Sequence, residues 1–305
     1  MTNPILFTLP GSEEFCAPLC RRLNAIIPCD TGELQIHYYP DAECSPRLMT
    51  PVTGRNIIFG MMLDRPDFKI MPVYLAASIA RELGARSVGF VVPYLPYMRH
   101  DADCRGSCKS GGRHFARLLS GCCDWLVTAE PCLGQRRSLS ELYTVTTRAV
   151  DAGPAIANWI AANVASPVIF ALNAENEKWA AGISEAADCP YAVLEKTEHD
   201  DQDAEVSIPD AKFWAGMTPV LIADIVSSAR IMIAASRQIE LAGMVPPVCI
   251  AVHPLFTGDA YDELRSSRVD RIVSCNTVSH ASNRIDLCQP IALAVADCIA
   301  KINGT

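Results

Sequence analysis

Short apolar runs alternate with amphipathic stretches along most of the chain. Each run is about as long as a buried strand, and each stretch carries apolar residues at the spacing of one helix face. The predicted strands cover residues 5–9, 34–38, 56–62, 87–92, 125–128, 167–172, 191–194, 220–222, 248–252 and 271–275. The predicted helices cover residues 13–23, 71–83, 113–119, 155–163, 176–187, 232–242 and 291–302.

Turn and cap residues punctuate this pattern. Ser12 precedes the first predicted helix and is expected to cap it, and Asp64-Arg65-Pro66 marks a turn before the second, which ends at Gly84. Residues 197–209 are polar and predict either a mobile loop or a hairpin. Strands that alternate with helices in units of about 30 residues predict an α/β fold with parallel sheets and right-handed crossovers. The alternation forms two series, which predicts two similar domains meeting near residue 150.

Composition narrows the function classes. The 305 residues are 50% hydrophobic and 20% charged, with a formal net charge of −8. No long basic run is present, so nucleic acid is not an expected partner. No apolar stretch reaches membrane-spanning length, and the N-terminus lacks the basic start and cleavage pattern of a signal peptide. We therefore expect a cytoplasmic protein of enzyme size, with no membrane association.

The 14 cysteines are scattered, with no C-x-x-C pair and no zinc-finger spacing. Thiols in such a protein are expected to be reduced and to pack as small apolar residues. An alternative is a zinc or redox site formed by Cys104, Cys108 and Cys132, although their spacing is not diagnostic.

The stretch from Pro219 to Met232 carries the first candidate chemistry. A short apolar strand is followed by Asp224, by the hydroxyl residues Ser227 and Ser228, and by a helix-compatible segment. In an open α/β sheet, loop amides and a helix N-terminus at such a place face a phosphate, and the acid can hold ribose hydroxyls. The alternative is an ordinary turn between a strand and a helix.

Several segments, taken in order, resemble ribose-phosphate diphosphokinases, the synthetases of phosphoribosyl pyrophosphate (PRPP), and in particular their archaeal-type branch. They are LPGSEEF, YYPDAE, VVPYLPYMRHD, VTAEPCLGQRRSLSELY, LNAENEKW, VLEKT and PVLIADIVSSAR. The resemblance implies two phosphoribosyltransferase-like domains, each a mostly parallel sheet flanked by helices. It assigns residues 1–149 to the ATP side, 150–290 to the ribose-phosphate side and 291–305 to a closing helix. It also implies a homo-oligomer, either a dimer or a hexamer.

The implied reaction transfers the diphosphoryl group of MgATP to ribose 5-phosphate, which yields PRPP and AMP. By resemblance, Lys196 is the catalytic lysine, although a surface lysine is the alternative. The positions that the resemblance assigns to ATP are Asp41, Glu43, Arg99, His100 and Asp101, and a solvated acidic turn is the alternative for the first two. The positions that it assigns to the ribose phosphate are Asp224, Ser227, Ser228, Ala229 and Arg230.

Other positions depart from the family pattern. Cys132-Leu133-Gly134 stands where the family carries H-x-H near the metal, and neither a thiol nor a glycine is a good Mg²⁺ ligand. Asn173 and Ala223 replace two aspartates of the family. Glu198 replaces the arginine of a K-x-R pair, a charge reversal beside a polyphosphate that should cost several kcal/mol, on the order of several decades in rate.

The retained fold and the altered centre favour a PRPP synthetase-like protein of nucleotide metabolism that is weakly active or non-catalytic. Such a protein would bind a nucleotide or phosphate and could assemble with an active paralogue. The alternative is an active ribose-phosphate diphosphokinase, with Mg²⁺ as its cofactor. A redirected enzyme that acts on another sugar phosphate is a third interpretation.

Overall fold

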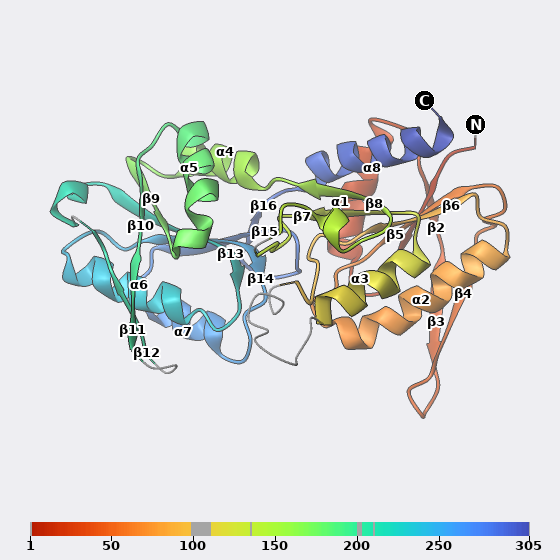
Figure 1. The fold of residues 1–305 in the computed structure, drawn as a ribbon, viewed down its shortest axis with the longest axis horizontal. Helices are drawn as coiled ribbons and strands as arrows, with labels where there is room; N and C mark the ends of the chain where they lie inside the picture. Colours follow the sequence, from red (N-terminus) through yellow and green to blue (C-terminus); the bar gives the residue numbers. More distant parts are fainter. Residues whose placement is uncertain (1, 99–110, 135, 200–202, 210, 305) are drawn as a thin grey trace. The chain divides into compact units, whose positions relative to one another are not determined.

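The computed structural model describes residues 2–98, 111–134, 136–199, 203–209 and 211–304. The chain forms two compact units (Figure 1). The first unit contains residues 1–150, 277–279 and 287–305, and the second contains residues 151–276 and 280–286. The α8 helix, Cys288–Asn303, therefore belongs to the first unit although it follows the second along the chain.

The first unit is built on a six-stranded parallel sheet in the order β2-β1-β5-β6-β7-β8. Helix α1 packs against α8, and α2 packs against α3. The strands are β1 (Ile5–Thr8), β2 (Asp30–Gly32), β5 (Asn56–Gly60), β6 (Ser87–Val91), β7 (Trp125–Ala129) and β8 (Thr146–Val150). The other helices are α1 (Glu13–Asn24), α2 (Pro66–Glu82) and α3 (Gly111–Cys122).

Aromatic side chains fill this core across adjacent strands. The register pairs Phe7 with Phe59 and Phe59 with Phe90. Their ring centroids lie 5.7 and 6.2 Å apart, and all three side chains are fully buried. The residue before Phe90 in β6, Gly89, pairs with Trp125, whose indole occupies the space that a side chain at position 89 would need. Helices on both sides of the sheet explain why the strands are continuous apolar runs.

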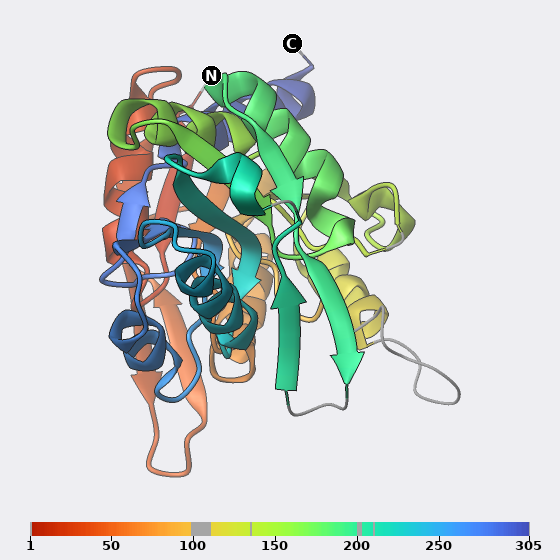
Figure 2. The ribbon, with the colours of Figure 1, turned by 90° about the vertical axis from the view of Figure 1, so that its left-hand side faces the viewer.

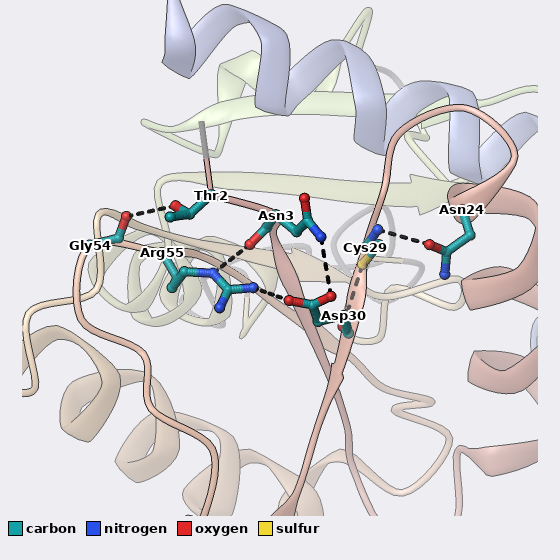
Figure 3. A network of polar contacts seen from close by, with 7 residues as sticks. All are labelled: Thr2, Asn3, Asn24, Cys29, Asp30, Gly54 and Arg55. Carbon is teal, nitrogen blue, oxygen red and sulfur yellow. Dashed lines mark hydrogen bonds and ion pairs between the residues drawn. The ribbon is translucent and has the colours of Figure 1, made fainter.

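A polar network closes the β2 edge of the sheet (Figure 3). The Arg55 guanidinium pairs with the Asp30 carboxylate, and its Nε donates to the Asn3 carbonyl at 2.6 Å. The Asn3 amide also donates to Asp30, at 3.2 Å. These bonds, chiefly the one from Arg55, lower the pKa of Asp30 below its ordinary value. The network supplies side-chain partners to a short strand that has few apolar residues.

A separate antiparallel ribbon belongs to the first unit. It pairs β3 (Leu34–Tyr38) with β4 (Cys44–Leu48), and β4 lies against α2.

The second unit has a six-stranded parallel sheet in the order β10-β9-β13-β14-β15-β16. A second antiparallel ribbon, of β11 and β12, packs against α6 (Figure 2). The strands are β9 (Pro167–Ala171), β10 (Tyr191–Val193), β11 (Glu195–His199), β12 (Asp203–Ser207), β13 (Thr218–Val226), β14 (Val248–Pro254), β15 (Arg271–Cys275) and β16 (Asn283–Ile285). The helices are α4 (Gly153–Asn163), α5 (Glu177–Ala187), α6 (Arg230–Leu241) and α7 (Ala260–Ser266).

The predicted α/β fold class is confirmed, with two parallel sheets flanked by helices. Helix α2 begins at Pro66 rather than at residue 71, because the proline occupies the first helical turn, where its missing N–H is tolerated. Residues 197–209 contain most of the β11–β12 hairpin, one of the two alternatives expected there. The sequence pattern missed β2, β4, β8, β16 and α7.

Ser12 precedes α1 as predicted, but the prediction that its side chain caps the helix is wrong. Its buried hydroxyl instead accepts a hydrogen bond from the Met62 amide at 3.0 Å, and so joins the helix start to the segment after β5.

No disulfide joins cysteines of the described ranges, and most of these cysteines are buried. Among the helices of those ranges, none combines the length and apolar content that a bilayer crossing requires.

Candidate functional site

The carboxyl end of β13 turns into α6 through Ser227, Ser228 and Ala229. Ala229 adopts a left-handed backbone conformation with φ of 56°, and its carbonyl accepts from the Ile233 amide at 3.0 Å. Its methyl group is buried in the core of the second unit. Glycine adopts this conformation most easily, so alanine at position 229 stores backbone strain at the turn.

The segment after β14 holds this turn from the side. The amides of Leu255 and Phe256 both donate to the Val226 carbonyl, at 3.0 and 3.1 Å. The Thr257 amide donates to the Ser227 carbonyl at 3.0 Å, and the two hydroxyls lie 3.4 Å apart. These contacts join the loops that follow two adjacent strands and fix the position of the β13–α6 turn.

An aromatic cluster includes Phe256, the residue before Thr257. The rings of Phe256, Tyr261 and His280 contact one another in pairs, with centroids 4.6 to 5.2 Å apart. His280 Nδ1 lies 2.7 Å from the Ser282 hydroxyl. Burial lowers the pKa of His280, so the neutral imidazole is favoured.

Asp224 lies near the carboxyl end of β13 and is half-buried. The amide of Asn176, at the start of α5, donates to Asp224 Oδ1 at 3.4 Å. Asn173, at the end of β9, accepts from the Asn176 backbone amide at 2.9 Å. Sequence reasoning missed Asn176, and the only available signal was an asparagine next to a helix start.

Arg230 is the first residue of α6, and its side chain is exposed. A cation at a helix N-terminus interacts unfavourably with the helix dipole, at a cost of about 0.3–1 kcal/mol in stability. A bound anion would reverse that effect, because the backbone amides and the guanidinium would then act together. Exposed Ser228 adds a hydroxyl donor beside Arg230.

The predicted acidic ATP residues lie in the first unit, on the loop between β3 and β4. Asp41 and Glu43 are exposed, and Asp41 Oδ1 accepts from the Glu43 amide at 3.2 Å. Ala42, which lies between them, adopts a left-handed backbone conformation with φ of 69°. Beside this loop is an open groove of about 600 Å³, which is lined by residues of the ribbon and of α2, among them Tyr38, Glu43, Phe68 and Met71.

The remaining predicted residues lie partly or wholly outside the description. Arg99, His100, Asp101, Cys104 and Cys108 fall outside the described residues. The backbone of Lys196 pairs with Val206 in the β11–β12 ribbon, as does that of Glu198 with Ala204, but neither side chain is described.

Comparisons with known proteins show what this chain resembles. The profile of the N-terminal domain of ribose phosphate pyrophosphokinase matches residues 5–121. The chain is 26% identical over 280 residues to the ribose-phosphate pyrophosphokinase of Saccharolobus solfataricus, which covers 90% of this chain and 95% of the relative. It is 23% identical to that of Methanopyrus kandleri, with 91% and 94% covered. The chain is therefore similar to ribose-phosphate pyrophosphokinases over most of its length.

The fold is also similar to that of a solved structure over nearly the whole chain. The crystal structure of phosphoribosylpyrophosphate synthetase from Mycobacterium smegmatis superposes with a TM-score of 0.84 at 15% sequence identity. The superposition covers 98% of this chain and all of that chain. The two proteins therefore share one fold, which here contains two parallel sheets.

The described residues provide few of the ligands that the magnesium ion implied by the resemblance would need. Cys132 is half-buried and packs against the apolar core of the first unit. At the strand ends of the second unit, Asp224 contributes a carboxylate, but Asn173 and Ala223 contribute none. Across the described ranges, no cluster of three histidine, cysteine or acidic side chains is arranged to hold a metal ion. Mg²⁺ prefers several oxygen ligands, usually with carboxylates among them.

Proposed function

We propose that this chain is a ribose-phosphate pyrophosphokinase relative that binds a phosphorylated ribose and a nucleotide but has little or no diphosphokinase activity. The observation that carries the proposal is the donor set at the carboxyl ends of β9 and β13. This set contains amides, hydroxyls and the Asp224 carboxylate. Among the described residues, it contains no group of acidic side chains arranged to hold a metal ion. Transfer of a diphosphoryl group from ATP requires neutralisation of a polyphosphate, for which Mg²⁺ is the usual agent.

The ribose phosphate would bind at the second unit. Ser227, Ser228, the Ala229 amide and Arg230 form a turn at the start of α6 that suits a phosphate, and Asp224 can accept from sugar hydroxyls. ATP would bind through Asp41 and Glu43 together with Arg99, His100 and Asp101. Lys196 would be the catalytic lysine of any residual transfer.

The second candidate is an active ribose-phosphate diphosphokinase. It is favoured by the retained residues Lys196, Arg99, Asp101 and Asp224, which match family positions. This candidate requires Mg²⁺ to be held largely by the substrate phosphates, a common arrangement for that ion.

We further propose that the chain self-associates, as a dimer or a hexamer, or pairs with an active paralogue. Exposed apolar side chains gather on α2 and on the adjacent ribbon, namely Tyr38, Tyr39, Phe68, Met71 and Tyr74. Phe68 is 80% exposed. A cluster of this kind beside an open groove is typical of a protein interface.

The decisive experiment measures AMP release from ATP, Mg²⁺ and ribose 5-phosphate, with Lys196→Ala as the control. We expect release no greater than that of the control, together with measurable binding of ribose 5-phosphate. Robust release that disappears in the Lys196→Ala variant would overturn the non-catalytic proposal in favour of the active enzyme.

A further inference from the structure

Asn176 has an unusual role for an asparagine at a helix start. It occupies the position before α5, where an asparagine side chain ordinarily accepts a hydrogen bond from an amide of the first turn. Here the side chain makes no such capping bond. Its Nδ2 is instead directed to Asp224 Oδ1, 3.4 Å away on a neighbouring strand.

Asn173 fixes the backbone from which Asn176 extends. Its side-chain oxygen accepts from the Asn176 amide at 2.9 Å and caps the short turn before α5. Asn173, Asn176 and Asp224 thus form a connected series across the carboxyl ends of β9 and β13. The side-chain amide of Asn176 stands beside the carboxylate, at a position from which a second acid could have reached it.

This arrangement changes what the carboxylate can bind. The Asn176 amide occupies one of about four acceptor positions on Asp224 and leaves the others open to hydroxyl donors. An amide N–H₂ directed at the carboxylate also places partial positive charge where a bridging cation would sit. The site is therefore suited to the hydroxyls of a sugar and poorly suited to a divalent ion.

We infer that Asn176 is a positioning residue that orients Asp224 to hold the hydroxyls of a phosphorylated ribose without a bridging divalent cation. The inference rests on the proposed function, in which the turn from Ser227 to Arg230 holds the phosphate group. It adds the residue that sets the geometry of the sugar site, and it makes binding of the sugar phosphate independent of metal.

Titration calorimetry of the full chain tests this inference, with ribose 5-phosphate and inorganic phosphate as probes, each in EDTA and in Mg²⁺. For the wild type we expect the same dissociation constant for ribose 5-phosphate in both buffers. Asn176→Ala should weaken binding of ribose 5-phosphate about five- to tenfold, the effect of losing one hydrogen bond of typical strength, and leave binding of inorganic phosphate unchanged. Asn176→Asp places a second carboxylate beside Asp224 and should make ribose 5-phosphate bind more tightly in Mg²⁺ than in EDTA.

Asn163→Ala is the matched control. Asn163 is an exposed asparagine at the end of α4, whose amide donates to the Trp159 carbonyl. This variant should leave both probes unaffected.

Three results would overturn the inference. Wild-type binding of ribose 5-phosphate only in Mg²⁺ would refute metal independence but leave the proposed ligand in place. Equal losses for ribose 5-phosphate and inorganic phosphate in Asn176→Ala would reduce Asn176 to a structural role. Wild-type protein that binds neither probe in either buffer would remove the proposed function itself, and the inference with it.

Discussion

Replacement of Gly89 by alanine should destabilise the first unit severely. A Cβ at this position of β6 would lie 1.9 to 2.4 Å from three indole atoms of Trp125, far inside van der Waals contact. Trp125 is fully buried, so its ring has little room to retreat. Overpacking of a well-filled core costs about 1–3 kcal/mol, occasionally more. Because the added methyl group would meet a large, enclosed ring, the cost of Gly89→Ala should reach the upper end of this range, about 3 kcal/mol.

Differential scanning calorimetry measures this effect. In a domain of this size, each kcal/mol shifts Tm by roughly 2–4 °C, so a decrease of about 6–12 °C is expected for the transition of the first unit. Gly121→Ala is the matched control, because Gly121 lies in α3 and a Cβ there meets no atom within 4 Å. That change should stabilise the protein by about 0.5–1 kcal/mol, since alanine favours a helix. An unchanged or raised Tm for Gly89→Ala would refute the packing of Trp125 over Gly89.

Three further predictions concern the two units separately. Burial holds the pKa of His280 below its ordinary value of 6.5, so the imidazole binds a proton more readily in the unfolded chain than in the folded one. Tm should therefore fall as pH decreases below about 6.5. His280→Gln should show a smaller fall between pH 8 and pH 5.5, and equal slopes would contradict the reasoning. Ala42→Gly relieves left-handed strain at an exposed position and should raise stability by about 0.5–1 kcal/mol in chemical denaturation, net of the entropy of glycine; a loss of stability would count against strain at this turn. Phe68→Ser should shift the protein toward monomer in light scattering after size exclusion, and an unchanged mass would exclude this face as the interface.

The fold was predictable wherever burial leaves a local pattern. Runs such as Ile57-Ile58-Phe59 are fully buried on both faces of a sheet and are therefore apolar without interruption. The edge strands β2 and β8 were missed because they are polar and short. The Asp30 carboxylate of β2 is held by contacts with Asn3 and Arg55, which lie far away along the chain and leave no local pattern.

The same contrast applies to the site. The turn from Ser227 to Arg230 was predictable, because strand, acid, hydroxyls and helix follow one another in the sequence. The contact of Asn176 with Asp224 was not, since 48 residues separate them and only the adjacency of β9 and β13 brings them together. The order of strands within a sheet is a property of the whole topology, and no local pattern encodes it.

The place of α8 in the first unit has a consequence for biosynthesis. Its buried face includes Cys288, Val295 and Ile299, and it packs on α1, whose Phe15 carbonyl accepts from the Cys288 thiol. On the ribosome, α1 emerges before the second unit, but the helix that covers it emerges only after the whole second unit has been translated. At about 5–20 residues per second, the nascent α1 face would stay uncovered for tens of seconds. The nascent chain would therefore offer a chaperone an apolar surface throughout that interval, and the unit that is begun first would be completed last.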